Sequence, residues 1–425
     1  MSKNIKNKNI WIFHHYATPP TINGFTRPYD LGVNLLNEGY KVTVFAASYI
    51  HLANVNLIND KRLYIINRDS EIPFVLINTP SYGNSYLRRI VNMCVYYKRL
   101  FKVTKKYIEN QQKPDLIIAS SPHPLAMVAG IRIAKRFKIP CICEVRDLWP
   151  EVFFMDGIVK KESILGKLLL RVEHWIYKEA DAIIFLKEGD YTYIIDNKWD
   201  VDQGGDIHLG ECHYINNGVD LESFYRQMNN NMLDDPDLNN DEMFNVVYTG
   251  AIRPVNNVGN ILDTASLLKD YKDIQFLIYG DGNQLGALKQ RVIDEQLTNV
   301  KFKGYVEKKY IPYILSKSSL NLLNYSQKNY NWSRGNSSNK LFEYMASGKP
   351  IISTVKMGYC PLEKYKCGLS LEDDTPEELA KTILKVYNMP EETYKQMGQN
   401  GKIGARDFDY KVLANKLVSI IEGLD

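Results

Sequence analysis

The segment 330–352 (YNWSRGNSSNKLFEYMASGKPII) has the residue types of an anion-binding loop followed by a helix. A Gly/Ser/Asn loop leading into a helix presents free backbone N–H groups and the positive end of the helix dipole, which suit a phosphate. We expect three residues to start this helix: Ser337, Ser338 and Asn339. Lys340 and Glu343 should project from one side of it, where a cation suits phosphate and a carboxylate can accept hydrogen bonds from two ribose hydroxyls. The alternative is a solvent-exposed ion pair on a capped helix.

Two glycine turns could bring backbone close to a ligand. Gly280 and Gly282 follow a predicted strand in the pattern GxGxxxG, which differs from the dinucleotide pattern GxGxxG. Such glycines let backbone approach a nucleotide, although a tight strand-to-helix turn needs the same residues. Near the start of the chain, 19–24 leads into a helix that contains Arg27, so a substrate could lie over Gly24. A simple turn explains that segment equally well.

Polar side chains follow two neighbouring predicted strands in the first half. The loop SSPHP contains His123, and the next loop, EVRDLWP, contains Asp147 and Trp149. Both loops should emerge at the same carboxyl edge of a parallel sheet. A carboxylate and a Trp are the usual parts of a sugar site, so these residues are candidates for sugar binding. The alternative for His123 is an ordinary surface residue.

The sequence offers no convincing metal site. Three Asp-x-Asp triplets could hold a divalent cation against a diphosphate: Asp200–Asp202, Asp235–Asp237 and Asp407–Asp409. None follows a predicted strand edge near the other polar groups, so no metal is expected. The motifs HExxH, GxxxxGK[ST] and GxSxG are absent, which argues against the commonest protease, NTPase and hydrolase chemistries.

The elements that must position these residues alternate between short β-branched or aromatic runs and helical stretches. This alternation predicts an α/β fold with parallel sheets. The pattern begins with a strand at Ile10–His14 and restarts with a strand at Phe244–Tyr248. Between them, the polar stretch Tyr225–Glu242 is expected to be an exposed loop. Two doubly wound halves imply a ligand cleft where the carboxyl ends of their strands face one another.

We expect an N-terminal domain at 1–217 and a C-terminal domain at 218–408. The segment 409–425 should be a helix that can cross back to the first domain.

The composition of the chain limits the classes of protein to which it can belong. The 425 residues are 45% hydrophobic and 24% charged, with 53 basic and 49 acidic side chains, which is typical of a soluble globular protein and disfavours nucleic acid as the main partner. No apolar run approaches the roughly 18 residues that span a bilayer. We therefore expect a cytoplasmic protein whose six cysteines are reduced. Cys141 and Cys143 should point to one side of a strand, which leaves a redox role as a minor alternative.

One segment could contact a membrane. Tyr86–Tyr107 carries seven Lys or Arg and no acidic residue, interleaved with aromatic and aliphatic side chains. Such a helix suits an anionic membrane surface at the cytoplasmic leaflet. The alternative is a helix that packs its apolar face on the first sheet and shows its charges to water.

Six segments, in order along the chain, resemble the retaining glycosyltransferases of family 4, which have the two-Rossmann GT-B fold. They are Gly24 with Arg27, EVRDLWPE, INNGVDLESF, VVYTGAIRP, LIYGDGNQL and SSNKLFEYMASGKPII. The RDLWPE and NKLFEYMASGKP forms are most similar to members that assemble bacterial surface polysaccharide, such as capsule or O-antigen. Those members commonly use UDP-linked N-acetylated sugars.

The resemblance implies a role for several residues. Glu343 would bind the donor ribose, and the helix start at Ser337–Lys340 would face the diphosphate. Arg253 would help neutralise the leaving group, and His123 would approach the transferred sugar. The donor nucleotide would also lie near Gly24, Gly280 and Gly282. The acceptor or sugar side would hold Arg27, Asp147 and Trp149.

Two positions depart from the family pattern. Gly335 stands where the first of two paired Glu residues is expected, eight residues before Glu343. The usual phosphate-binding Lys beyond Gly250 is replaced in the run Asn256–Asn257. The first departure leaves the donor sugar open, and the second shifts leaving-group charge onto Arg253 or Lys340.

The implied reaction is a retaining hexosyl transfer (EC 2.4) from a nucleotide-sugar co-substrate, with UDP-N-acetyl sugars favoured, and with no metal or other cofactor. The acceptor would be a lipid-linked or saccharide hydroxyl. Alternatives are a sugar-nucleotide 2-epimerase of the same fold, a two-Rossmann oxidoreductase and a non-catalytic sugar-binding subunit.

Overall fold

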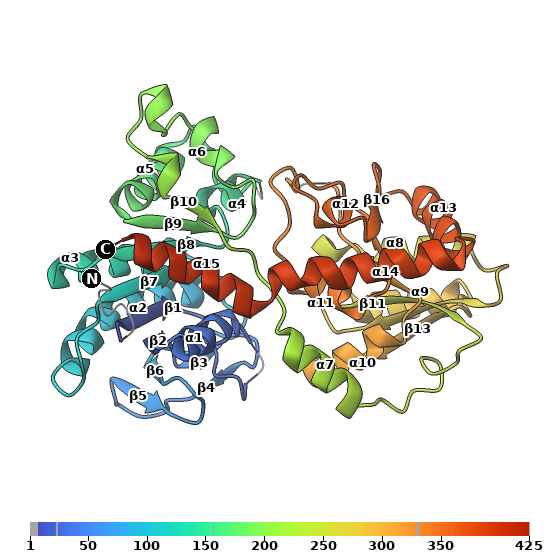
Figure 1. Cartoon of the computed structure of the whole chain (residues 1–425), viewed down its shortest axis with the longest axis horizontal. Coiled ribbons are helices and arrows are strands. Elements are labelled where there is room, and N and C mark those ends of the chain that lie inside the picture. Colours follow the sequence, from blue (N-terminus) through green and yellow to red (C-terminus); the bar gives the residue numbers. More distant parts are fainter. Residues whose placement is uncertain (1–6, 23, 156, 329–330, 425) are drawn as a thin grey trace. The chain divides into compact units, whose positions relative to one another are not determined.

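The structure is a computed structural model that describes residues 7–22, 24–155, 157–328 and 331–424 (Figure 1). It divides into two compact units. The first comprises the chain up to Asn216 together with the stretch from Leu413 onward, and the second comprises Asn217–Val412. Each unit has its own parallel sheet, so both halves are α/β, as the alternating pattern predicts.

The first sheet has eight strands in the order β10-β9-β8-β7-β1-β2-β6-β5. All neighbours are parallel except β5 and β6. The strands are β1 Asn9–His14, β2 Lys41–Ala47, β5 Tyr64–Asn67, β6 Phe74–Ile77, β7 Leu116–Ser120, β8 Cys141–Val145, β9 Ala182–Phe185 and β10 Cys212–Tyr214. A separate two-stranded sheet pairs β3 Tyr49–Ile50 with β4 Val55–Asn56.

Alternation along the central strands sends side chains to two helical layers. Trp11, Ile117 and Cys143 face one layer, which contains α2 and α3. Ile12 and Ile118 face the other, where they meet α1 and Leu417. The helices of this unit are α1 Arg27–Asn37, α2 Tyr86–Tyr107, α3 Pro124–Phe137, α4 Trp149–Met155, α5 Ile164–Glu179 and α6 Thr192–Asp196.

The second sheet is parallel throughout, in the order β13-β12-β11-β14-β15-β16. Its strands are β11 Phe244–Thr249, β12 Ile274–Tyr279, β13 Val300–Gly304, β14 Leu320–Leu323, β15 Ile351–Ser353 and β16 Gly368–Ser370. Its helices include α7 Leu221–Asn230, α8 Val258–Leu267, α9 Leu285–Asp294, α10 Ile311–Ser316, α11 Asn339–Ser347, α12 Pro361–Lys364, α13 Pro376–Tyr387 and α14 Glu391–Ala405. The last helix, α15 Tyr410–Gly423, starts in the second unit and continues into the first.

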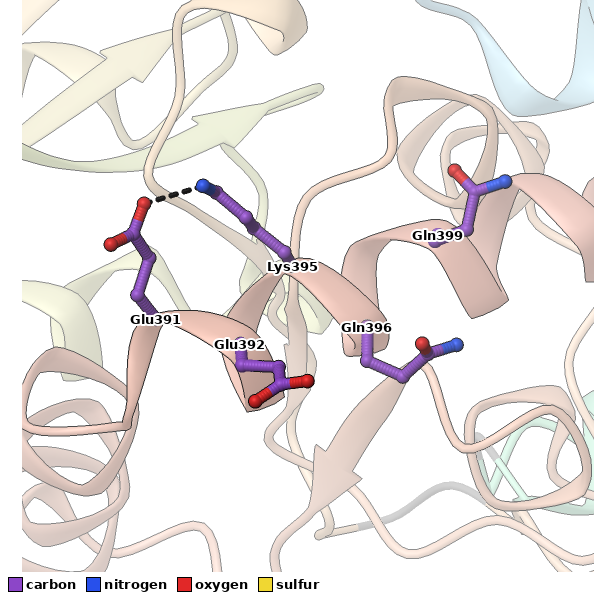
Figure 2. Close-up of a pocket in the computed structure, with 5 residues that line it drawn as sticks. All are labelled: Glu391, Glu392, Lys395, Gln396 and Gln399. Carbon is purple, nitrogen blue, oxygen red and sulfur yellow. Dashed lines mark ion pairs between the residues drawn. The ribbon is translucent and has the colours of Figure 1, made fainter.

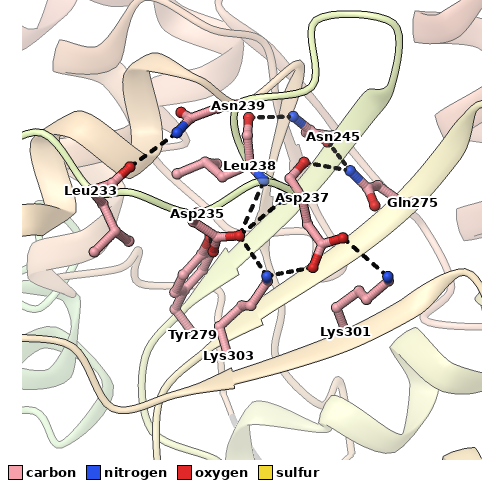
Figure 3. A network of polar contacts seen from close by, with 10 residues as sticks. All are labelled: Leu233, Asp235, Asp237, Leu238, Asn239, Asn245, Gln275, Tyr279, Lys301 and Lys303. Atoms are coloured by element: carbon pink, nitrogen blue, oxygen red, sulfur yellow. Dashed lines mark hydrogen bonds and ion pairs between the residues drawn. The ribbon is translucent and has the colours of Figure 1, made fainter.

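The expectation of an exposed loop at Tyr225–Glu242 is wrong for 225–230, which belong to a helix, and holds only in part for 231–242, a loop in which Asp235 and Leu238 are buried. Helix α7 extends to Asn230, and the following residues pack on the second sheet through the network in Figure 3. Asp235 Oδ1 lies 2.6 Å from Lys303 Nζ, and Asp237 Oδ1 lies 3.0 Å from Lys301 Nζ. These ion pairs satisfy the carboxylates, which allows this polar stretch to pack against the protein.

Two further features concern membrane-spanning helices and the state of the cysteines. Among the described residues, no helix is both long enough and apolar enough to cross a bilayer. All six cysteines are free, and Cys141 and Cys143 both belong to the core beneath the α2–α3 layer.

Candidate functional site

A row of polar side chains lies buried at the carboxyl edge of the first sheet. His14 and Ser120 end their strands, Glu144 is the last residue but one of β8, and the three lie in register, since His14 pairs with Ser120 and Ser120 with Glu144. Each follows a run of buried apolar residues, and each is itself at most 5% exposed. The strands therefore deliver a polar cluster to the edge where ligands bind in sheets of this type.

Arg27 holds this edge together from α1. Its Nε and Nη2 donate to Glu144 Oε2 at 2.9 and 2.8 Å, and its guanidinium also donates to the carbonyls of Ile215 and Asn216. Burial alone would raise the pKa of Glu144, but the charges of Arg27 and Arg146 outweigh it and lower this pKa to about 2. Arg27 is only 3% exposed, so its role in the structure is to hold α1 against the carboxyl edge of the sheet.

His123 belongs to a buried hydrogen-bonded relay that runs from His123 through His15 to Asn92. Its Nε2 lies 2.7 Å from His15 Nδ1, and His15 Nε2 lies 2.6 Å from Asn92 Oδ1. The Asn92 amide nitrogen donates to the Pro80 carbonyl, which leaves Oδ1 as the acceptor for His15. His15 then carries its proton on Nε2, so its Nδ1 must accept from His123 Nε2–H.

This relay fixes the tautomer of His123, and the unprotonated Nδ1 of His123 faces away from His15. That atom is buried and has no hydrogen-bond partner in the described parts of the chain. Burial, together with the charges of His14 and Arg89, lowers the pKa of His123 to about 3. The arrangement presents a neutral acceptor, which suits a hydroxyl donor such as a sugar.

The loop after β8 lies beside His123. The Trp149 indole N–H donates to the Pro122 carbonyl, one residue before His123. Trp149 is half-buried and Asp147 is exposed, so both can contact a ligand. Gly24 packs against Thr18, whose Cγ2 would lie 2.4 Å from an added Cβ. Its neighbour Asn23, part of the predicted turn, lies outside the described residues.

In the second unit, helix α11 follows the predicted anion-binding loop. Ser338 is its extended N-cap, and Gly348, with φ at +73°, ends it. Leu341, Phe342, Tyr344 and Met345 are buried beneath the helix. The start of the loop at Tyr330 lies outside the described residues, whereas Asn217 Nδ2 donates to the Ser337 carbonyl.

Lys340 lies in an aromatic cage. Its Nζ is 4.6 Å from the ring centroids of both Tyr248 and Tyr325, and 3.3 Å from the Tyr248 hydroxyl. Burial lowers the pKa of Lys340 to about 7. A cation that is costly to keep charged without an anionic partner is well suited to bind one.

Two other predicted residues surround this lysine. A Cβ added at Gly250 would lie 3.3 Å from Lys340 Nζ, and the exposed Arg253 follows three residues later in the same loop. Glu343, one turn along α11, is half-buried. Burial raises the pKa of Glu343, and the charge of Lys308 opposes this shift. Lys340 thus lies beside the Gly250 turn, and Arg253 and Glu343 lie on the two segments, the loop after β11 and helix α11, that meet there.

Gly280 and Gly282 have a packing reason to be glycine. A Cβ at Gly280 would lie 1.8 Å from the Gly250 carbonyl oxygen, and one at Gly282 would lie 2.2 Å from that of Ile252. The two loops are also joined by a hydrogen bond from Ile252 N–H to the Asp281 carbonyl. These glycines therefore shape the loop that carries Arg253.

The two departures from the family pattern also have structural counterparts. Gly335 has φ at +106°, a conformation that a Glu would rarely adopt. Asn256 donates to the Ala251 carbonyl, and its own carbonyl accepts from Asn324. The position that lacks a lysine therefore holds the loop after β11 in place.

The hollow beside α14 is a poor site by comparison. It measures about 510 Å³ and is lined by the residues drawn in Figure 2, which all come from one helix. Lys395 in it is paired with Glu391 at 2.5 Å. Within the described ranges, no group of three or more His, Cys, Asp or Glu side chains could hold a metal ion.

Several residues of the candidate site were not predicted from the sequence. His15 and Asn92 lie 77 positions apart, and Tyr248 and Tyr325 come from different strand ends. Only the His14–His15 pair at the end of a predicted strand could have drawn attention to the relay.

Comparison with known proteins identifies both halves. Residues 26–203 match the family described as "Glycosyl transferase 4-like domain", and residues 233–403 match "Glycosyl transferases group 1". TuaH of Bacillus subtilis, described as a glycosyltransferase of teichuronic acid biosynthesis, is 26% identical over 59% of this chain. WbjE of Pseudomonas aeruginosa, described as a glycosyltransferase, is 20% identical over 62% of it. The matches span 62% of the length of each relative.

Solved structures show the same fold across nearly the whole chain. Sucrose-phosphate synthase from Thermosynechococcus elongatus superposes with a TM-score of 0.69 at 17% identity, covering 98% of this chain and 99% of that one. HepE of Anabaena, solved with UDP-glucose, gives 0.66 at 17% identity, covering 98% and 100%. The chain therefore carries two glycosyltransferase domains and has the GT-B fold, with two Rossmann-like units.

Proposed function

We propose that this chain is a retaining glycosyltransferase that moves a sugar from a nucleotide diphosphate, with UDP-N-acetyl sugars favoured, to a lipid-linked or saccharide acceptor. The observation that carries the proposal is the half-buried Lys340 ammonium between Tyr248 and Tyr325 at the start of α11. A helix start and a desolvated cation form a binding site for a diphosphate.

The main chemical task is electrostatic. When the glycosidic bond to the diphosphate breaks, negative charge builds on the leaving group, and Lys340 and Arg253 supply positive charge without a metal. Glu343 accepts hydrogen bonds from the ribose hydroxyls. His123 Nδ1 accepts from a hydroxyl of the transferred sugar, which holds the sugar for attack by the acceptor hydroxyl.

The known proteins lend support to a UDP-linked donor and to a role in polysaccharide synthesis. HepE of Anabaena has been solved with UDP and with UDP-glucose. TuaH is named for teichuronic acid biosynthesis, and WaaG, another structural neighbour, for lipopolysaccharide biosynthesis. These names support a role in the synthesis of bacterial surface polysaccharide. Both matched family descriptions are glycosyl transferases, which favours transfer over the epimerase alternative.

We assign acceptor binding to the first unit and donor binding to the second. The enzyme would act in the cytoplasm at the inner face of the membrane, where α2 can contact anionic lipid. Its first turns expose Tyr86, Leu87, Ile90 and Val91. The rest of α2 packs on the sheet through residues such as Tyr96 and Leu100.

A thermal-shift screen against UDP-, GDP- and ADP-sugars tests the proposal, and UDP-sugars should give the largest shift. Glu343→Gln should weaken binding by about 2 to 3 kcal/mol, because it weakens two charge-assisted hydrogen bonds. The exposed Glu377 offers a matched control, and Glu377→Gln should bind like the parent. Equal binding by both variants would refute the assigned ribose site.

A further inference from the structure

The inward face of α2 begins with an arginine. Arg89 starts a row that continues through Asn92 and Tyr96, residues three or four positions apart that share one side of the helix. Asn92 and Tyr96 are fully buried, Arg89 is half-buried, and its neighbour Arg88 is exposed. Since Asn92 ends the relay that starts at His123, the same face of α2 brings a guanidinium to the polar edge of the first sheet.

Tyr16 holds Arg89 in one orientation. The Nε of Arg89 donates to the Tyr16 hydroxyl at 3.1 Å, and the guanidinium carbon lies 5.4 Å from the centroid of the Tyr16 ring. Tyr16 is itself only 4% exposed, so its ring is fixed by packing. The two terminal nitrogens, Nη1 and Nη2, make no hydrogen bond to any part of the chain that the structure describes. They form a fork that suits the oxygens of an anion.

No carboxylate of the described residues pairs with Arg89. The groups that interact with its charge are tyrosines and neutral histidines, namely Tyr16, Tyr82, Tyr86, His15 and His123. His51 completes the surroundings, because its ring centroid lies 5.8 Å from that of Tyr16 and 5.6 Å from that of Tyr82. A half-buried cation among neutral groups lacks the counter-charge that would normally accompany it. This environment favours an anionic ligand.

The hydroxyl of Tyr82 is a further polar group without a partner. Burial raises the pKa of Tyr82, the nearby Tyr16 raises it further, and the charge of Arg89 opposes the shift. The hydroxyl is buried, yet no atom of the described ranges is placed to form a hydrogen bond with it. By contrast, Arg27 directs its guanidinium to Glu144 and to backbone carbonyls. We call the set Tyr16, His51, Tyr82 and Arg89 the Arg89 cluster.

The Arg89 cluster lies beside His123. The Tyr16 ring centroid is 6.1 Å from that of His123 and 4.4 Å from that of His15, so Tyr16 contacts both the relay and Arg89. After burial and His14, the charge of Arg89 is the next cause of the low pKa of His123. The proposed function places the transferred sugar at His123, and the attacking acceptor hydroxyl must lie next to that sugar. Arg89 is therefore placed to bind another group of the acceptor.

We propose that the Arg89 cluster binds an oxyanion of the acceptor, so that the acceptor is a saccharide carrying a phosphate or a carboxylate. Nη1 and Nη2 of Arg89 donate to two oxygens of the anion, and Tyr16 keeps this fork in place. The proposal rests on the proposed function, because it takes the first unit as the acceptor side. Binding of an anion at Arg89 does not itself require that the chain transfers sugar.

Nuclear magnetic resonance of the full chain labelled with ¹⁵N-arginine tests the proposal. The Arg89 Nε–H signal, identified by its loss in Arg89→Gln, is followed during titration with methyl phosphate, with glucuronate or with the neutral methyl glucoside. The titrations use a Lys340→Gln background, which removes the assigned diphosphate site of the second unit. Methyl phosphate or glucuronate should shift the signal saturably, and methyl glucoside should not. The tighter of the two anions distinguishes a phosphate from an acidic sugar, whereas no shift with either would overturn the proposal.

Matched variants assign the binding to this arginine. In titration calorimetry, Arg89→Gln should lower affinity for the preferred anion at least about tenfold, because it removes the charge and the fork. Arg88→Gln removes the same charge from the same turn of α2 and should bind like the parent. Arg89→Lys keeps the charge, which protects the fold, but it should still lose about fivefold without the fork. Tyr16→Phe keeps the ring, removes the acceptor for Nε and should also weaken binding. Parental affinity in Arg89→Gln and Arg89→Lys, or an equal loss in Arg88→Gln, would overturn the proposal.

Nucleotide binding separates this proposal from the proposed function. With Lys340 in place, the thermal shift caused by UDP reports on the second unit and should be the same in Arg89→Gln as in the parent. Loss of anion binding with intact UDP binding supports the acceptor site. A parent that binds an anion at Arg89 but no nucleotide sugar would refute the proposed function and leave the anion site standing. A parent that binds UDP-sugar but no anion at Arg89 would do the reverse.

Discussion

His123 Nε2 lies 2.7 Å from His15 Nδ1, and this contact determines which nitrogen of His123 carries the proton. Asn92 accepts from His15 Nε2–H, so His15 can only accept from His123. The relay of fixed tautomers leaves Nδ1 of His123 as an acceptor, and this is the atom to which we assign a sugar hydroxyl. Such preorganisation avoids the cost of reorienting a ring during the reaction.

The first prediction concerns this tautomer. In protein labelled with ¹⁵N-histidine, His123 should appear as the neutral Nε2–H form at pH 7. Asn92→Asp places a carboxylate beside His15 and should raise its pKa, which lies well below 6.5 in the parent because of burial and the neighbouring His123. The variant should then show a new acid limb in kcat/KM that the parent lacks. Asn92→Gln is the uncharged control, and an identical acid limb in both variants would contradict a relay.

The strands that carry this site could be predicted from sequence, because parallel strands buried on both faces are continuous apolar runs. The runs that end at His14, Ser120 and Val145 are of this kind. The predicted cap and stop of α11 were also sound, since Gly348 ends that helix with a positive φ. These features depend on neighbours within a few residues, and local sequence contains that information.

The relay and the aromatic cage could not be predicted in this way. Asn92 comes from α2, where its type indicates only a polar position on a basic helix. Tyr325 reaches Lys340 because β14 lies next to β11, a strand order that the sequence does not state. The packing of 231–242 could not be predicted for the same reason, because Asp235 and Asp237 are paired with Lys301 and Lys303, which lie on β13.

The second prediction is that the first unit loses stability in acid from about pH 6.5 downward. Burial lowers the pKa of His14 and of His123 to about 3, so between pH 6.5 and 3 the unfolded chain binds protons that the folded chain does not. Stability therefore falls with pH in this window, by up to about 1.4 kcal/mol per pH unit for each histidine. Below pH 4.5 the depressed pKa of Glu144 adds to the loss.

Thermal midpoints measured from pH 8 to pH 4 test this prediction. His14→Asn should have a lower midpoint at pH 8 but a shallower decline toward pH 5. The exposed edge residue His208 provides the control, and His208→Asn should decline as the parent does. A parental slope in His14→Asn would show that His14 does not contribute.

The third prediction is that transfer does not need a divalent cation, because Lys340 and Arg253 provide the positive charge. Activity in excess EDTA should stay close to that in Mg²⁺. Arg253→Gln should raise the activation free energy of transfer by about 2 to 3 kcal/mol, and added metal should not restore the rate. Activity that disappears in EDTA and returns with Mg²⁺ or Mn²⁺ would refute it.

The last prediction is that nucleotide binding takes up a proton at Lys340. In the ligand-free protein, burial lowers the pKa of this group to about 7, so at pH 8 much of it is neutral. A bound diphosphate favours the ammonium and raises its pKa, so affinity for UDP should fall as pH rises from 7 to 9. Titration calorimetry at pH 8 in buffers of different ionisation enthalpy should show uptake of a substantial fraction of a proton. Lys340→Arg stays charged over this range and should abolish the uptake while keeping measurable affinity, whereas Lys340→Gln should lose affinity at every pH. Equal proton uptake in the parent and in Lys340→Arg would place the titrating group elsewhere, and parental affinity in Lys340→Gln would remove Lys340 from the diphosphate site.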